Sequence, residues 1–347
     1  MNAVAGELEL LSLDQRWEKP LALDTVYVGG GTPSMLGEGA LASMREAFAP
    51  YASWEDASVE WTAEANPESF TLSLAEDWRR TGVNRISLGV QTFHEPALRW
   101  MGRMHGAAGA VRAMLTARTA GFHNVSVDLI FGLPERLGRD WKDDLERALE
   151  LEPDHVSLYG LTAEIATPLG RWVREGREHL ADEDRYADEY LLANQTLTAA
   201  GFQHYEVSNF GLPGFRSRHN FAYWTGAPYA ALGPGAHGFH PPCRRWNLKG
   251  WEAYRDAVAA GRLPIDGSEI IAEKEVELEA IWLGLRTDIG YPLAVLAAKQ
   301  RQLAALWVSR GLAFSDDVVL KLTANGWLLL DQLALELSAA GKPASDE

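Results

Sequence analysis

The amino-acid sequence predicts an α/β fold, a partial β/α barrel followed by a small helical domain. The first observation behind this prediction is an alternation of short apolar runs with amphipathic stretches, which begins at Asp24. Such alternation is typical of a parallel sheet whose strands are joined by helices. The second observation is a joint between helix and strand that occurs three times. An open, doubly wound sheet is the alternative arrangement of the same elements.

The strands and helices of the predicted barrel follow one another in a regular order. Six apolar segments are expected to form strands: Thr25–Val28, Val59–Ala63, Arg85–Val90, Asn124–Leu129, His155–Tyr159 and Gln203–Val207. Five amphipathic segments are expected to form helices: Ala40–Phe48, Leu74–Arg80, Ala108–Thr119, Trp141–Leu149 and Asp184–Ala199. The joints are Gly82-Val83, Gly121-Phe122 and Gly201-Phe202. A glycine can end a helix in the left-handed conformation, and the apolar residue after it folds back onto the last turn.

Composition divides the chain into three expected parts. The barrel occupies residues 1–210, a region rich in Gly and aromatic residues occupies 211–270, and a small domain occupies 271–347. In the last part, the patterns predict helices over Glu275–Leu285 and Leu293–Arg310, then a strand over Val318–Leu322 and a helix over Leu328–Leu337. This order resembles a winged-helix module.

Ahead of the first strand, Glu7–Trp17 reads as the back half of a helix, so the expected barrel lacks its opening strand.

Charge and cysteine content exclude several classes of protein. The 347 residues carry 32 Lys and Arg against 48 Asp and Glu, a net charge of −16, which disfavours nucleic acid as a partner. Cys243 is the only cysteine, so neither an intrachain disulfide nor a multi-cysteine metal site is possible. Met1–Leu13 does not read as a signal peptide, and no apolar run is long enough to span a bilayer. We therefore expect a cytoplasmic protein.

A glycine-rich motif follows the first expected strand directly. Gly29-Gly30-Gly31-Thr32-Pro33 allows backbone groups to approach a small ligand closely. The motif is neither a P-loop nor GxGxxG, so it does not imply a nucleotide phosphate. A tight turn without a ligand is an equally good interpretation of this motif alone.

Polar residues also fall at the ends of consecutive strands. They are Glu64, Gln91, Asp128, Thr162 and Glu164. In a β/α barrel the carboxyl ends of the strands line the ligand site, so we expect a shared pocket there. Each carboxylate taken alone could instead cap the following helix. Arg103, one short helix after Gln91, could pair with a ligand carboxylate.

Five motifs in order give the chain a specific resemblance. They are Val26–Ser34, Arg85–Phe93, Gly102–His105, Val127–Pro134 and Tyr205–Phe210. From about Val4 to its C-terminus, the chain resembles the heme chaperone HemW family and the related oxygen-independent coproporphyrinogen III oxidases, which are radical S-adenosylmethionine (SAM) proteins. The resemblance implies a radical SAM barrel of the (β/α)6 type and a small C-terminal domain of the same family.

The resemblance implies roles for the residues of the expected pocket. Gly31 and Thr32 would face the methionine part of SAM. The rest of the SAM site would be lined by Glu64, Gln91, Arg103, Asp128 and Thr162. Family members also carry CxxxCxxC after the first barrel strand, and these cysteines hold a [4Fe–4S] cluster. The sequence lacks this motif, so we expect no reductive cleavage of SAM. We also expect that Met1 is not the true start, or that the gene is truncated.

The stretch Arg218–Trp224 resembles the HNxxYW motif associated with heme binding in HemW proteins. The resemblance implies that His219 is the axial ligand of heme iron and that Tyr223 and Trp224 cover the porphyrin. His237 and Cys243 are further possible ligands. The alternative is a loop histidine held by aromatic packing.

The resemblance as a whole implies a carrier that passes heme to an acceptor protein. Such an acceptor could lie at the membrane surface, and the carrier could be a homodimer. The enzymatic alternative is oxidative decarboxylation of coproporphyrinogen III by radical chemistry. A third possibility is a non-catalytic remnant that keeps the fold without a cofactor.

Overall fold

A seven-stranded curled sheet forms the centre of the protein. The computed structural model describes residues 2–14, 16–17, 20–54 and 58–341. The strand order is β2-β4-β5-β6-β7-β9-β8, and the first five strands are parallel. Their bounds are β2 Thr25–Val28, β4 Glu60–Ala65, β5 Arg85–Gln91, β6 Val125–Phe131 and β7 His155–Gly160. The sheet curls into a half-barrel, which confirms the partial β/α barrel.

The sixth expected strand differs from the prediction. Gln203–Val207 was expected to be one more parallel strand, whereas β8 (Gln203–Glu206) and β9 (Asn209–Gly211) form an antiparallel hairpin. β9 pairs antiparallel with β7 and so lies between β7 and β8. The reversal occurs within two residues, Val207 and Ser208, which carry no glycine or proline to indicate a turn.

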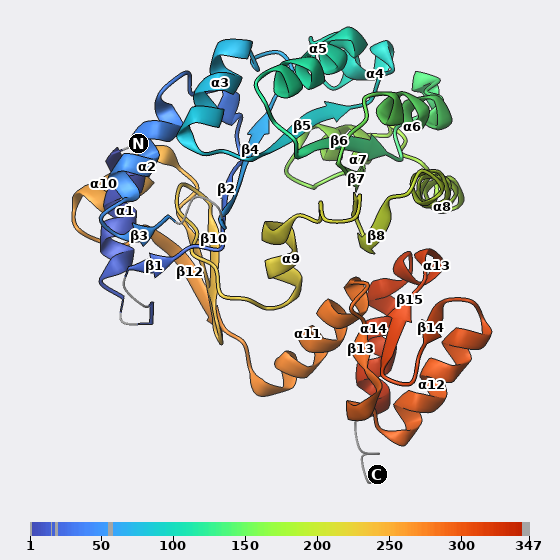
Figure 1. The fold of residues 1–347 in the computed structure, drawn as a ribbon. Coiled ribbons are helices and arrows are strands. Elements are labelled where there is room, and N and C mark those ends of the chain that lie inside the picture. Colours follow the sequence, from blue (N-terminus) through green and yellow to red (C-terminus); the bar gives the residue numbers. More distant parts are fainter. Residues whose placement is uncertain (1, 15, 18–19, 55–57, 342–347) are drawn as a thin grey trace.

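Helices lie along the outer side of the half-barrel, and α9 lies on its inner side (Figure 1). The helices that follow the strands of the half-barrel are α2 Ala40–Phe48, α3 Leu72–Thr81, α4 Glu95–Trp100, α5 Gly106–Thr119, α6 Trp141–Glu150, α7 Pro168–Arg174 and α8 Glu183–Ala199. Short 3-10 turns occur at Pro33–Met35 and Glu135–Leu137. Gly82, Gly121 and Gly201 all have positive φ, which confirms the repeated joint.

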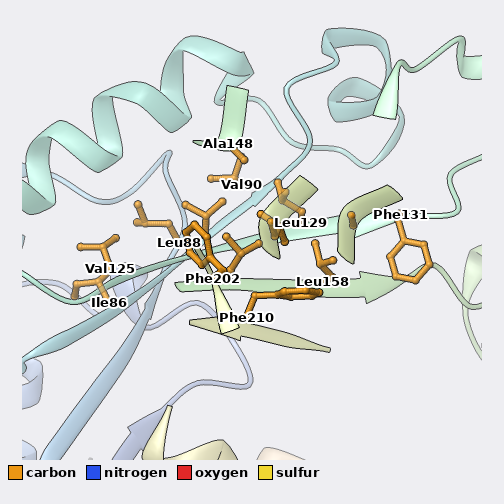
Figure 2. Close-up of a cluster of buried hydrophobic side chains, with 14 of the residues drawn as sticks. Ile86, Leu88, Val90, Val125, Leu129, Phe131, Ala148, Leu158, Phe202 and Phe210 are labelled. Carbon is orange, nitrogen blue, oxygen red and sulfur yellow. The ribbon is translucent and has the colours of Figure 1, made fainter. Parts of the chain in front are cut away.

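The core lies between the sheet and the outer helices. Figure 2 shows strand residues such as Leu88 and Leu129 in one cluster with Ala148 of α6, with Phe202 just before β8 and with Phe210 of β9. Alternate residues of the same strands are polar and face the concave side, because side chains alternate across a strand. Ser87, Ser126 and Asp128 are examples. The concave side is thus a polar interior on which a ligand site can be built.

The middle part of the chain forms a second, antiparallel sheet of three strands in the order β10-β11-β12. Its elements are α9 Arg218–Trp224, β10 His237–His240, β11 Cys243–Asn247, α10 Trp251–Ala259 and β12 Ile265–Ile270. The N-terminal helix α1 (Asn2–Ser12) packs on α10, and two short strands, β1 (Leu21–Ala22) and β3 (Ala52–Ser53), pair beside it.

Glu7 of α1 is completely buried and ties the N-terminal helix to this middle part. Its carboxylate accepts hydrogen bonds from the Gly233 N–H at 2.8 Å, from Asn247 Nδ2 at 2.6 Å and from the Tyr254 hydroxyl at 2.6 Å. A buried carboxylate is tolerated only when such donors satisfy it. The first helix is therefore an integral part of the fold.

The C-terminal part consists of helices around a small three-stranded sheet of order β13-β15-β14. Its elements are α11 Glu273–Arg286, β13 Tyr291–Pro292, α12 Ala298–Ser309, β14 Ala313–Ser315, β15 Val319–Leu322, α13 Ala324–Trp327 and α14 Leu330–Gly341. The expected helix over Leu293–Arg310 is divided, because Leu293–Val295 is a 3-10 turn and α12 begins only at Ala298. Within the described part of the chain, no helix has the length and apolarity needed to cross a membrane.

The half-barrel and the C-terminal part are joined by a buried ion pair. Glu206 of β8 is fully buried, and its Oε2 lies 3.2 Å from Nε of Arg286, at the end of α11. Backbone hydrogen bonds accompany the pair: the Val207 N–H donates to the Arg286 carbonyl, and the Asp288 N–H donates to the Tyr205 carbonyl. The Tyr205–Phe210 motif thus holds the end of α11 against the sheet.

Candidate functional site

A cavity of about 230 Å³ lies at the carboxyl ends of the parallel strands. Six of the seven residues expected to bind SAM line it: Gly31, Thr32, Glu64, Gln91, Arg103 and Asp128. Thr162 is not among the lining residues and is exposed in the loop after β7. Tyr159 and Ser87 line the cavity instead, although the sequence analysis did not select them. Both lie at inward-facing strand positions, which is the signal that could have identified them.

The glycine motif forms one wall of this cavity, which is the smaller of the two described here. The motif is a tight turn and also leaves space for a ligand, so both interpretations of the sequence apply. Gly30 has φ of 79°, a turn conformation that favours glycine, and its N–H donates to Glu64 Oε2 at 3.2 Å. A Cβ atom on Gly29 would lie 2.5 Å from the Tyr27 ring and 2.6 Å from the Glu64 carboxyl. By contrast, a Cβ atom on Gly31 would meet no heavy atom within 4 Å. The turn therefore packs against Glu64 and leaves open space at Gly31.

Two carboxylates occupy the base of the smaller cavity. The Tyr27 hydroxyl donates to Glu64 Oε1 at 2.6 Å, and the Ser87 hydroxyl lies 2.9 Å from both carboxylate oxygens of Asp128. Burial raises the pKa of Asp128 to about 6, although the hydrogen bond from Ser87 and the nearby Arg85 charge act in the opposite direction. The cavity therefore presents negative charge at neutral pH and suits a ligand with a cationic group.

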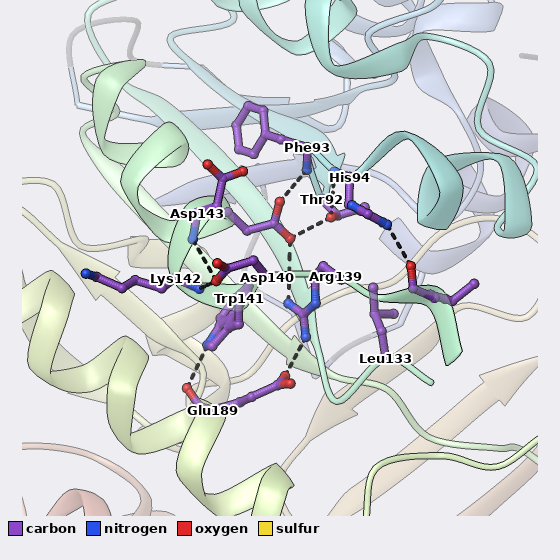
Figure 3. Close-up of polar contacts among 12 residues, drawn as sticks. Thr92, Phe93, His94, Leu133, Arg139, Asp140, Trp141, Lys142, Asp143 and Glu189 are labelled. Atoms are coloured by element: carbon purple, nitrogen blue, oxygen red, sulfur yellow. Dashed lines mark hydrogen bonds and ion pairs between the residues drawn. The ribbon is translucent and has the colours of Figure 1, made fainter. Parts of the chain in front are cut away.

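A buried polar network (Figure 3) holds the residues that directly follow Gln91, the last residue of β5. Gln91 has φ of 69°, which is unusual for a residue with a side chain. Asp144 of α6 accepts hydrogen bonds from the Thr92 hydroxyl at 2.5 Å and from the Phe93 N–H at 2.7 Å. Arg139 lies 3.6 Å from Asp144 and also pairs with Glu189 of α8. Helices α6 and α8 thus fix the turn that directs Gln91 into the cavity.

His219 lies at the opposite end of the strands. The backbone N–H groups of Arg218 and His219 donate to Glu60, the first residue of β4, at 3.0 and 2.9 Å. The imidazole Nδ1 lies 2.8 Å from the Thr25 hydroxyl, and Nε2 lies 2.7 Å from the Tyr223 hydroxyl. Burial lowers the pKa of His219 to about 4, so the ring is neutral at physiological pH. Both ring nitrogens already have partners in this structure.

The His219 ring also connects the two ends of the half-barrel. It stacks on the Tyr27 ring with centroids 5.1 Å apart and planes at 19°. Tyr27 in turn bonds Glu64 in the smaller cavity, and His219 bonds Tyr223 on its other side. A continuous chain of four side chains therefore runs from the smaller cavity to α9.

A larger cavity of about 920 Å³ lies beyond α9, between the three-stranded sheet and the C-terminal helices. Tyr223 and Trp224 of α9 line it, as do His237 and Phe239 of β10 and Arg244 of β11. Other lining residues come from α11 and α14: Leu278, Glu279, Trp282, Leu283, Ala334 and Leu335. This cavity is not apparent from the sequence, because its walls come from residues that are far apart along the chain.

The residues present do not fit an iron–sulfur cluster. The sequence holds a single cysteine, Cys243, which lies in β11 and does not line the smaller cavity. Among the residues that the structure describes, no group of three or more His, Cys, Asp or Glu is arranged to hold a metal ion. Three thiolates are the usual protein ligands of a SAM-binding cluster, so we derive no step through such a cluster.

Comparisons with known proteins agree with the half-barrel fold. The family model of the radical SAM superfamily matches residues 12–148. The chain is 37% identical to the heme chaperone HemW of Mycobacterium tuberculosis, over 96% of this chain and 85% of that protein. It is 33% identical to the heme chaperone HemW of Bacillus subtilis, over 95% and 88%. The solved structure of coproporphyrinogen III oxidase (HemN) from Escherichia coli has the same fold, with a TM-score of 0.79 at 19% identity, over 97% and 82%.

Proposed function

Because this chain belongs to the HemW family of the radical SAM superfamily, we propose that it binds heme and transfers it to an acceptor protein. The larger cavity is the observation that supports this proposal. Its volume of about 920 Å³ lies near the top of the usual range for cofactor sites, about 300–1,000 Å³. Aromatic and aliphatic side chains make up most of its lining, as a flat apolar macrocycle requires.

The HNxxYW-like stretch contributes directly to this cavity. Tyr223 and Trp224 line it, whereas His219 stands behind Tyr223 and is not among the lining residues. This arrangement favours a carrier over the enzymatic alternative, since a porphyrin in the larger cavity would lie away from the strand ends that form the SAM-type pocket. The likeness to HemN at 19% identity supports the shared fold and does not by itself favour porphyrin decarboxylation.

Titration with hemin tests the proposed function. We expect the purified chain to bind about one hemin, to give a defined Soret band, and to release the heme to apomyoglobin. Leu278→Asp places a carboxylate in the apolar wall and should weaken hemin binding at least tenfold. Val276→Asp is the matched control, because Val276 lies on the same helix, is exposed and does not line the cavity. Equal, non-saturable hemin uptake by all three proteins would favour the non-catalytic remnant.

We further propose SAM as the ligand of the smaller cavity. Glu64 and Asp128 complement its sulfonium and amino groups, and Arg103 complements its carboxylate. When a cluster is present, its open iron anchors the amino-acid end of SAM; here only hydrogen bonds and charge remain, each worth about 1 kcal/mol net. After the ordering cost of binding is subtracted, these interactions leave only a small net free energy of SAM binding.

We therefore expect weak SAM binding by the 347-residue chain. Isothermal calorimetry should give a dissociation constant above the micromolar range. S-adenosylhomocysteine, which lacks the sulfonium charge, should bind more weakly still, because the carboxylates then lose their cationic partner. A submicromolar dissociation constant for SAM would contradict this prediction.

A further inference from the structure

We propose that His237 is the axial ligand of the heme iron in the larger cavity, with Arg244 as the partner of a heme propionate. This assignment rests on the proposed heme-binding function and specifies its site. It differs from the sequence-based expectation, which favoured His219 and treated His237 as a further possibility.

The register of the small sheet places His237 on the cavity wall. In the β10–β11 pair, His237 lies opposite Trp246 and Phe239 lies opposite Arg244. Alternate residues of a strand share one face, so these four side chains lie on the same face of the sheet. Three of them, His237, Phe239 and Arg244, line the larger cavity.

The state of the two imidazoles distinguishes the candidates. His237 is exposed, and among the described residues it has no hydrogen-bond partner. Both nitrogens of His219 are occupied by Thr25 and Tyr223 hydroxyls. Iron binding at His219 would first break a partly buried hydrogen bond, whereas an unpaired nitrogen of His237 is available at once.

The indole ring of Trp246 lies beside the His237 ring. The two rings stack with centroids 6.0 Å apart and planes at 23°. Trp246 itself lies against Gly267 of β12, where an added Cβ atom would come within 2.3 Å of the indole ring. The glycine thus makes room for the indole, which stacks on the imidazole.

The opposite wall suits a porphyrin face. Trp224 and Trp282 meet edge to face with centroids 6.2 Å apart, and the Arg286 guanidinium lies 3.9 Å from the Trp224 ring on one side. The Trp224 Nε1 group is buried and has no hydrogen-bond partner among the described residues. A buried donor without an acceptor is costly, and it is available to a bound polar group.

Arg244 is positioned for a propionate, in competition with protein carboxylates. Among the described residues that line the cavity it is the only Lys or Arg. Its guanidinium already pairs with Glu269, at 3.4 Å, and with Glu279. A propionate must therefore displace a carboxylate rather than meet a free cation. This exchange limits the affinity for heme, which suits a carrier that has to release its cargo.

His219 becomes a positioning residue under this assignment. Its Nε2 holds the Tyr223 hydroxyl at 2.7 Å, and Tyr223 packs edge to face on Tyr229, another lining residue, with centroids 4.6 Å apart. Loss of the His219 ring would loosen Tyr223 without removing the iron ligand. Replacement of His219 should thus lower the affinity for heme without changing the spectrum.

Hemin titrations of three histidine variants test the assignment. We expect His237→Ala to weaken hemin binding at least tenfold and to shift the Soret band, and added imidazole to restore the wild-type spectrum. His219→Ala should bind hemin more weakly with the wild-type spectrum. His240→Ala is the matched control, because His240 lies on the same strand but on its other face, where Nε2 lies 3.0 Å from the Arg16 carbonyl oxygen. It should bind as the wild type does.

The outcomes separate this inference from the proposed function. If the wild type binds hemin and His237→Ala keeps both its affinity and its Soret band, the ligand assignment is wrong and the heme carrier stands. A changed Soret band in His219→Ala alone would assign the ligand to His219 and overturn the inference. If the wild type itself shows no saturable hemin binding, the proposed function fails first.

Discussion

Replacement of Arg286 by Ala is expected to lower the free energy of unfolding by about 3–5 kcal/mol, the usual cost of leaving one partner of a buried ion pair alone. Glu206 is fully buried, and Arg286 is 14% exposed, so solvent cannot replace the lost guanidinium. The same guanidinium lies 3.9 Å from the Trp224 ring and 5.1 Å from the Trp282 ring. Its loss should therefore also weaken hemin binding, because two residues that line the larger cavity, Trp224 and Trp282, lose this contact.

Urea denaturation of the variant and of a matched control measures this effect. Arg216→Ala is the control: Arg216 pairs with Asp288 at 2.5 Å in the same junction, but the two side chains are 36% and 30% exposed. Partly exposed ion pairs contribute about 0–1 kcal/mol to stability, so the free energy of unfolding of this variant should be close to that of the wild type. If the free energy of unfolding of Arg286→Ala is also within about 1 kcal/mol of the wild-type value, this ion pair does not hold the C-terminal part against the sheet.

Asp128→Asn is expected to stabilise the unliganded chain above pH 6 by up to about 3 kcal/mol. Burial raises the pKa of Asp128 from 3.8 to about 6, and a shift of one unit corresponds to about 1.36 kcal/mol. Above pH 6 the carboxyl is ionised in both the folded and the unfolded chain, so the folded chain carries the full cost of burying the charge. Below pH 4 the carboxyl is protonated in both states, and this cost is absent. The free energy of unfolding of the wild type should therefore fall as the pH rises from 4 to 6, because the cost of burying the charged carboxylate appears in this range.

The asparagine keeps an acceptor for the Ser87 hydroxyl and carries no charge. Thermal unfolding of both proteins between pH 4.5 and pH 8 should show a stability difference that grows with pH. Asp143→Asn is the control, since this α6 carboxylate is exposed and its replacement should change the stability only slightly. A constant difference for Asp128→Asn across the range would mean that Asp128 titrates at its ordinary pKa.

The pocket at the strand ends could be predicted because parallel strands carry their carboxyl ends to one edge of the sheet. A residue such as Asp128 is then placed by register alone. Thr162 illustrates the limit of this argument: it lies beyond the last residue of β7, where register no longer determines direction. Tyr159, still within the strand, lines the cavity instead.

Features that depend on long-range packing could not be predicted. Glu7 reads as an ordinary solvent-facing residue of an amphipathic helix, yet its three partners lie between 226 and 247 residues away. The larger cavity is hidden for the same reason, since Trp282 and Leu335 reach it from a part of the chain with its own small sheet. The β8–β9 reversal is not apparent from the sequence because no glycine or proline indicates it.

The stacked pair of Tyr27 and His219 lies between Glu64 of the smaller cavity and Tyr223 of the larger cavity. Any ligand that takes up Glu64 Oε1 competes directly with the Tyr27 hydroxyl, and Tyr27 lies against the ring that supports Tyr223. If this contact couples the two binding equilibria, thermodynamic reciprocity requires the coupling free energy to be equal in both directions. Whatever factor SAM imposes on the affinity for heme, heme must impose on the affinity for SAM.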